Sequence, residues 1–107
     1  MLTVLALPGC PPTRHHLKDS NLKSLQGAVG GPIELLSIHT PSGPLDVWVN
    51  EEGILLGLPF NRTVQGSPLV GPILVTASNA EGDTIGLSNA QADAAISLLL
   101  DSPAFYY

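Results

Sequence analysis

Two apolar runs flank a short acidic turn in the stretch Asp46-Val47-Trp48-Val49-Asn50-Glu51-Glu52-Gly53-Ile54-Leu55-Leu56-Gly57-Leu58-Pro59-Phe60-Asn61-Arg62. β-Branched and aromatic residues in the first run favour a strand from Leu45 to Asn50. Glu51, Glu52 and Gly53 then form a turn, in which we expect Gly53 to adopt the left-handed conformation of a tight hairpin. The second run predicts a returning strand from Ile54 to Leu58, so the stretch is typical of a β-hairpin.

Side chains alternate between the two faces of the first of these strands. Val47 and Val49 lie on one face and are predicted to point into the core. Asp46, Trp48 and Asn50 share the other face. Trp48 is therefore expected on a face that also carries polar groups.

Further apolar runs, each bounded by Gly or Pro, predict four more strands. These runs are Leu2 to Leu7, Ile33 to His39, Pro72 to Ala77 and Thr84 to Leu87. The third is rich enough in Ile, Leu and Val to be a central strand. We expect a loop over residues 13–17 and irregular chain over residues 59–68.

Two segments have helical patterns. Asp19 or Ser20 can cap a short helix that ends near Gln26, with Leu22 and Leu25 on one face. Ser88 and Gln91 have the spacing of a capping box, which predicts a second helix over 89–101. Pro103 ends this helix, and its apolar stripe consists of Ala92, Ala95, Ile96, Leu99 and Leu100.

Together these elements predict an α+β fold. It consists of a small antiparallel meander sheet of five to six strands, a C-terminal helix packed on one face and a short N-terminal helix. A chain of 107 residues is in the usual size range of a single domain, so we expect one domain over 1–107.

The composition limits the partners. Charged residues make up 12% of the chain, roughly half of the usual ~25%, and the net charge is −5. Four scattered basic residues cannot neutralise a broad phosphate footprint, so duplex nucleic acid is not an expected partner. No apolar run is long enough to span a membrane. The single cysteine fits a cytoplasmic location, and the low charge together with the aromatic tail, residues 104–107, predicts a homo-oligomer.

Polar and aromatic residues near the hairpin form a candidate ligand site. An aromatic ring can stack on a ligand, an amide can read its polar edge, and an Arg fork can hold a phosphate or carboxylate. The predicted site residues are Trp48, Asn50, Glu51, Phe60, Asn61 and Arg62. In the alternative interpretation, Trp48 and Phe60 are core or dimer contacts.

Catalytic chemistry has weaker signals. Glu34 interrupts an apolar strand, and we expect it to form a structural pair with Arg62. His15, His16 and His39 do not offer the three or four convergent ligands that a metal needs. No catalytic residue, metal or cofactor is therefore predicted.

Several short segments resemble a family of small uncharacterised domains found in bacteriophages and mobile elements. They are Gly-Gly-Pro-Ile-Glu from Gly30, Val-Asn-Glu-Glu-Gly from Val49, Gly-Leu-Pro-Phe-Asn-Arg from Gly57 and Gly-Pro-Ile-Leu-Val from Gly71. The resemblance implies an accessory protein that acts in the cytoplasm, without an activity to transfer.

One preferred function and two alternatives follow. The first is a non-catalytic binding module for a small, nucleotide-like ligand or a host protein, with a role in countering host defence. The alternatives are a metal-assisted hydrolase that uses Glu51 and Glu52, and a purely structural or oligomerisation domain.

Overall fold

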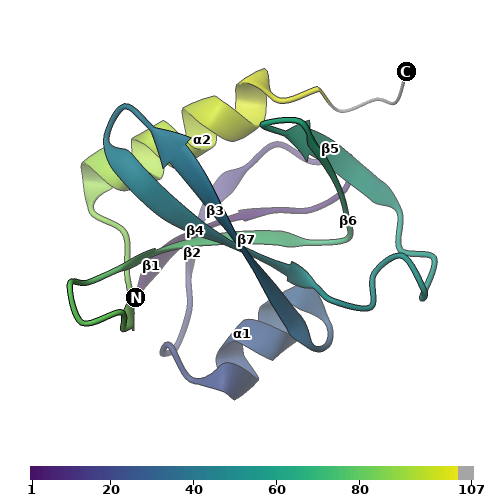
Figure 1. Ribbon diagram of the computed structural model, residues 1–107, viewed down its shortest axis with the longest axis horizontal. Helices are drawn as coiled ribbons and strands as arrows, with labels where there is room; N and C mark the ends of the chain where they lie inside the picture. The colour runs from purple at the N-terminus through teal and green to yellow at the C-terminus, as the bar shows by residue number, and fades with distance from the viewer. Residues whose placement is uncertain (104–107) are drawn as a thin grey trace.

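A computed structural model describes residues 1–103, which form eight strands and two helices (Figure 1). The strands are β1 (Leu2–Ala6), β2 (Thr13–His16), β3 (Ile33–Thr40), β4 (Gly43–Asn50), β5 (Phe60–Val64), β6 (Ser67–Val70), β7 (Ile73–Ser78) and β8 (Thr84–Ile85). The helices are α1 (Leu22–Val29) and α2 (Asn89–Asp101).

The main sheet is antiparallel and has the strand order β2-β1-β7-β4-β3, with β8 paired to β7. Five consecutive residues of β7, from Ile73 to Ala77, are buried, as expected for its central position. β5 and β6 form a separate two-stranded ribbon.

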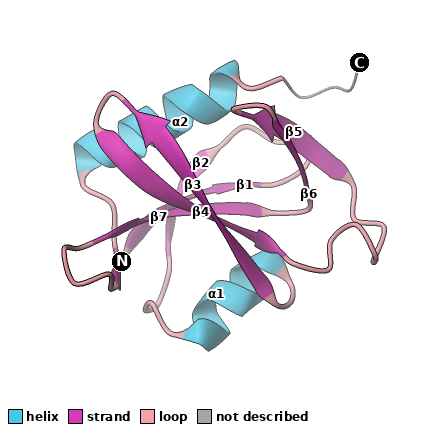
Figure 2. Ribbon diagram, in the orientation of Figure 1, coloured by secondary structure: helices cyan, strands magenta, loops and turns pink. Residues whose placement is uncertain are grey.

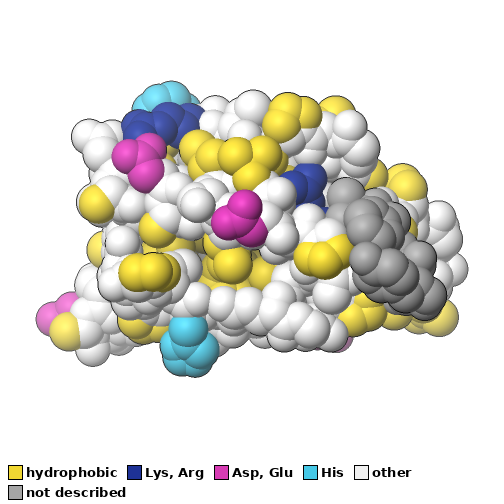
Figure 3. All heavy atoms as spheres, turned by 90° about the horizontal axis from the view of Figure 1, so that it is seen from above, with side chains coloured by type: hydrophobic (Ala, Val, Ile, Leu, Met, Phe, Trp, Pro, Cys, Tyr) yellow, Lys and Arg dark blue, Asp and Glu magenta, His cyan; other side chains and the backbone are white. Residues whose placement is uncertain are grey.

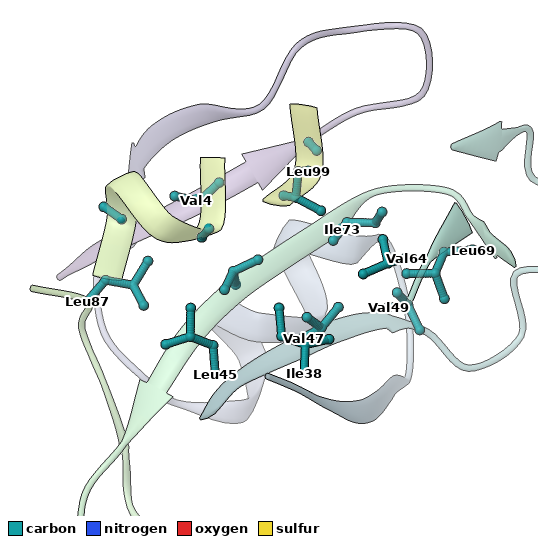
Figure 4. Packing of buried hydrophobic residues seen from close by; sticks show 14 of the residues in the cluster. Val4, Ile38, Leu45, Val47, Val49, Val64, Leu69, Ile73, Leu87 and Leu99 are labelled. Carbon is teal, nitrogen blue, oxygen red and sulfur yellow. The ribbon is translucent and has the colours of Figure 1, made fainter. Parts of the chain in front are cut away.

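A helix covers each face of the sheet (Figure 2). α2 closes over the larger core, to which Val47 and Val49 contribute from β4 and Leu99 contributes from the helix (Figure 4). α1 closes the opposite face through Leu25 and Val29, which pack with Leu74. The prediction that Val47 and Val49 face the core is confirmed.

The α+β class, the six antiparallel strands and both helices are confirmed. The strand order is not sequential, because β7 lies between β1 and β4. α2 begins with the predicted capping box of Ser88 and Gln91. Leu100, which belongs to the predicted apolar stripe of this helix, is exposed.

The predicted strand from Ile54 to Leu58 is wrong, because residues 51–57 form turns. β4 already pairs with β3 on one side and β7 on the other, so no edge remains for a returning strand. Gly53 is not left-handed; Gly57 is, with φ of 69°. Gly53 is needed for space instead, because an added Cβ would lie 2.8 Å from Cγ2 of Val70.

Two regions predicted to lack regular structure contain strands. Residues 13–17 include β2, a polar strand at the edge of the sheet. Residues 59–68 include β5 and the start of β6, which are joined by Gln65 and Gly66 with φ of 47° and 85°. A two-residue turn with both φ values positive suits a hairpin, and Gln-Gly was a weak signal for it.

The first helix also differs in detail from its prediction. It begins at Leu22, and the carboxylate of Asp19 accepts hydrogen bonds from the backbone N–H of Asn21 and the hydroxyl of Ser24. Leu22 is exposed, whereas Leu25 and Val29 are buried at i, i+4 spacing. The helix therefore packs through Leu25 and Val29 instead of the expected Leu22 and Leu25.

Candidate functional site

The six predicted site residues do not form one patch. Trp48 lies on the α1 side of the sheet, where it packs against Leu25 and Leu74. Arg62 reaches the end of α2 on the other side. The structure brings Asn61 and Arg62 together, and separately places Asn50 beside Glu51.

Trp48 is part of the smaller core. Its indole Nε1 donates a hydrogen bond to Oγ1 of Thr76 at 2.8 Å, and Thr76 is fully buried. A satisfied indole packed under α1 supports the structure of this smaller core.

Asn61 and Arg62 form a buried polar cluster that we call the Asn61–Arg62 clamp. Asn61 is 2% exposed, and its Nδ2 donates to the carbonyls of Ala6 at 2.9 Å and Gly71 at 2.8 Å. It thereby joins the end of β1 to the chain before β7.

Arg62 extends the clamp to two further segments. It is 5% exposed and donates from Nε to Oδ1 of Asn61, from Nη1 to the Leu99 carbonyl and from Nη2 to the Cys10 carbonyl. The Leu99 carbonyl lies in the last turn of α2, where a positive charge is favourable. Burial lowers the pKa of Arg62 from its ordinary value, yet a guanidinium remains charged at neutral pH.

The expected pair between Glu34 and Arg62 is absent from the structure. Glu34 is exposed on β3, and all donor groups of Arg62 that bond in residues 1–103 contact carbonyl oxygens. In this part of the chain the ion pair is instead between Arg14 and Asp93, at 2.7 Å on the surface.

Asn50 fixes the loop that follows β4. Its side chain accepts from the backbone N–H of Glu52 at 2.8 Å and donates to the Val29 carbonyl at 3.3 Å. Gly31 must lack a side chain here, because an added Cβ would lie 2.8 Å from Nδ2 of Asn50. Phe60 is half-buried and lies opposite Val70 in the β5–β6 ribbon.

Three consecutive aliphatic side chains project from this loop into solvent. Ile54 is 83% exposed, Leu55 89% and Leu56 58%. We call these three residues the apolar loop. The backbone N–H groups of residues 56, 57 and 58 donate to the carbonyls of residues 52, 54 and 53 at 2.9 to 3.1 Å. The loop is therefore held in one shape while its side chains remain uncovered.

A hollow of about 230 Å³ lies beside the apolar loop, between β3, β4 and β6. We call it the acidic hollow, because the charged residues in its wall are Glu34 and Glu51. The remaining wall consists of Leu36, Val49, Asn50, Ile54, Ser67, Pro68, Leu69 and Val70. The hollow combines apolar side chains with carboxylates, and its lining within residues 1–103 includes no Lys or Arg.

Two observations on residues 1–103 bear on catalysis. This part of the chain has no group of three or more His, Cys, Asp or Glu side chains that could hold a metal ion. His39, Ser97 and Asp101 line a second hollow of about 280 Å³. No hydrogen bond joins these three side chains within residues 1–103, so a hydrolytic triad is not assembled there.

The α2 side of the surface carries few charges. Figure 3 shows Lys and Arg scattered among hydrophobic and neutral side chains, without a broad basic patch on this face. Across residues 1–103, neither helix has the length and hydropathy needed to cross a lipid bilayer.

The sequence pattern of a family described as a domain of unknown function, DUF3846, matches residues 1–100. The chain belongs to the DUF3846 family. No curated protein and no solved structure matches it. The resemblance to a family of small uncharacterised domains is thus confirmed at the level of the family.

The two specific segments behind that resemblance have different roles in this DUF3846 domain. Asn-Glu-Glu-Gly opens the apolar loop, whereas Pro-Phe-Asn-Arg supplies the clamp. Sequence reasoning missed the apolar loop as a site. The available signal was a short aliphatic run between Gly53 and Gly57 with no period of a helix or strand.

Proposed function

We propose that this DUF3846 domain is a non-catalytic module that binds a partner protein through the apolar loop and the acidic hollow. The observation that carries the proposal is the exposure of Ile54 and Leu55 on a backbone fixed by its own hydrogen bonds. Exposed aliphatic side chains in a cluster are typical of contact surfaces. A loop already held in shape loses little conformational freedom on binding.

The charges beside the loop define the partner. Glu34 and Glu51 favour a surface that presents Lys or Arg around an apolar cleft large enough for two aliphatic side chains. A net charge of −5 favours the same kind of partner at longer range.

A nucleotide-like ligand has less support. A phosphate would meet Glu34 and Glu51 at the acidic hollow, and the guanidinium of Arg62 is already committed to carbonyls. A protein of the host cell therefore fits the site better than a nucleotide. An accessory role for a bacteriophage or mobile element, an action against host defence and a cytoplasmic location are part of the proposal.

A selection from a random peptide library displayed on a carrier tests the proposal. We expect the enriched peptides to combine Lys or Arg with aliphatic or aromatic residues and to lose binding to the double variant Ile54→Ser/Leu55→Ser. Leu22→Ser/Leu100→Ser serves as a matched control, because it removes two exposed leucines that lie in α1 and α2, outside the apolar loop. This variant should bind the peptides like the natural chain.

Nuclear magnetic resonance then locates the contact. Changes in chemical shift on addition of the selected peptide should concentrate at residues 51–58 and at Glu34. Enrichment of acidic peptides, or equal binding to the double variant, would overturn the proposal. A shift in melting temperature with nucleotides in the same buffer would favour the nucleotide-binding alternative instead.

A further inference from the structure

Among residues 1–103, no backbone or side-chain partner pairs with the outer edge of β3 at three residues. In the part of the chain that the structure describes, β3 is the last strand on its side of the sheet and pairs with β4 alone. The Glu51 N–H donates to the Pro32 carbonyl at 2.8 Å, so Pro32 and Glu51 are a hydrogen-bonded pair. The two kinds of pair alternate along an antiparallel ladder, so the next pair, Ile33 and Asn50, has no mutual hydrogen bonds. Alternation then directs the backbone N–H and C=O groups of Ile33, Leu35, Ser37 and His39 away from β4.

A side chain occupies the edge at the last of these residues. Gln65, at the tip of the β5–β6 ribbon, donates from Nε2 to the His39 carbonyl at 2.6 Å and accepts the His39 N–H at 3.3 Å. Its amide thus takes the place of a strand residue. The open segment ends at this point and consists of Ile33, Leu35 and Ser37.

Most other strand edges are protected. Pro68 interrupts β6, and the Thr63 N–H of β5 donates to the Pro103 carbonyl. β2, the opposite edge of the main sheet, is short, polar and charged at Arg14. Proteins commonly block edges in these ways because free edges recruit other strands. β3, by contrast, presents an unblocked segment with Leu35 at its centre, 50% exposed.

We propose that this segment pairs antiparallel with the same segment of a second copy, on a two-fold axis through Leu35. Ile33 then lies opposite Ser37 of the second copy, Leu35 opposite Leu35, and Ser37 opposite Ile33. All three pairs consist of outward-facing residues, so each pair exchanges both backbone hydrogen bonds.

The side chains fit this symmetry. The two Leu35 side chains cover each other on the α1 face, and Glu34 lies opposite Leu36 of the second copy rather than opposite another carboxylate. Gln65 stands just beyond the paired segment and sets its length. A second copy is favoured over a foreign strand because it covers the exposed Leu35 with an apolar side chain of the same size and sets no carboxylate opposite Glu34. The inference goes beyond the proposed function, since the apolar loop is not part of this contact, although Glu34 and Leu36 of the acidic hollow lie in the paired segment.

Solution mass by analytical ultracentrifugation, from micromolar to millimolar protein, tests the proposal. We expect a dimer for the natural chain and a monomer for Leu35→Lys, which sets two like charges against each other. Leu100→Lys should remain a dimer, because it adds the same charge at an exposed position on α2. A monomeric natural chain, or a dimeric Leu35→Lys variant, would overturn the proposal.

Disulfide trapping tests the register. The only cysteine, Cys10, is exposed and is first changed to Ser. In that background Leu35→Cys should form covalent dimers on mild oxidation, because paired residues lie about 5.5 Å apart between Cα atoms, within disulfide range. Ser37→Cys should not, since Ile33 lies opposite. Covalent dimers of Ser37→Cys without covalent dimers of Leu35→Cys would overturn the register. The variant Ile54→Ser/Leu55→Ser should still dimerise, which keeps this test separate from the proposed function.

Discussion

The Asn61–Arg62 clamp and the apolar loop are close in sequence but opposite in environment. The clamp places an amide and a guanidinium in the interior, at 2% and 5% exposure. The apolar loop places three aliphatic side chains outside. In these two regions the polar side chains therefore belong to the interior, and the aliphatic side chains belong to the surface.

The difference arises from which backbone groups each region can satisfy. β1, α2 and the loop at Cys10 all end near the clamp and leave carbonyls that need donors. The apolar loop satisfies its own backbone through local turns, so its side chains are not required for the fold.

The largest effect is expected from Arg62→Ala. It leaves the part-buried Cys10 carbonyl without this donor and the buried Leu99 carbonyl with only the 3.4 Å bond from the Ser102 N–H, and the free energy of unfolding should fall by about 3 kcal/mol. Urea denaturation measures the change. Arg14→Ala is the matched control, because an exposed ion pair contributes only about 0–1 kcal/mol. Equal losses in the two variants would remove the distinction between clamp and surface.

Asn61→Ala should cost about 2 kcal/mol, because the Ala6 and Gly71 carbonyls lose their donor. The double variant Asn61→Ala/Arg62→Ala should cost less than the sum of the single changes, since the two side chains bond to each other. Strictly additive losses in denaturation would show that they do not act as one unit.

Gly53→Ala should destabilise the domain by about 1–2 kcal/mol, because its Cβ would press against Cγ2 of Val70. Adding Val70→Ala should restore part of the lost stability by making room. Absence of any rescue, measured by thermal unfolding, would indicate that the loop is not seated against β6.

The smallest effect concerns Asp19, an exposed reference for the buried clamp. Hydrogen bonds from the Ser24 hydroxyl and the Asn21 N–H lower the pKa of the Asp19 carboxyl. Its stabilising contribution is therefore present above the unfolded pKa of about 4 and is lost as pH falls through the lower folded value. Ser24→Ala should raise the pKa of Asp19, as followed by a nuclear magnetic resonance titration. An unchanged titration curve would contradict this assignment.

Local patterns predicted much of the fold. The Ser88 and Gln91 capping box, the apolar run of β7 and the alternation at Val47 and Val49 each indicate one element without reference to distant chain. β2 and the β5–β6 ribbon escaped prediction because their residues are polar or interrupted by Pro and Gly. The strand from Ile54 was mispredicted because only the sheet order shows that β4 has no free edge.

The candidate site was harder to predict. Arg62 is an obvious donor, but its acceptors at Leu99 and Cys10 lie 37 and 52 residues away in sequence. No local pattern indicates that these carbonyls converge on it. Glu51 lies in the predicted turn, yet many of its neighbours in the acidic hollow come from the distant strands β3 and β6 and not only from β4 and the apolar loop.

The free energy of unfolding of Ile54→Ser/Leu55→Ser tests the central contrast most directly. We expect it to stay within about 0.5 kcal/mol of the natural chain, because exposed side chains outside the core contribute little to stability. A loss of about 2 kcal/mol or more would be comparable to the truncation of a buried aliphatic side chain. It would show that the apolar loop belongs to the core and would contradict its assignment as a contact surface.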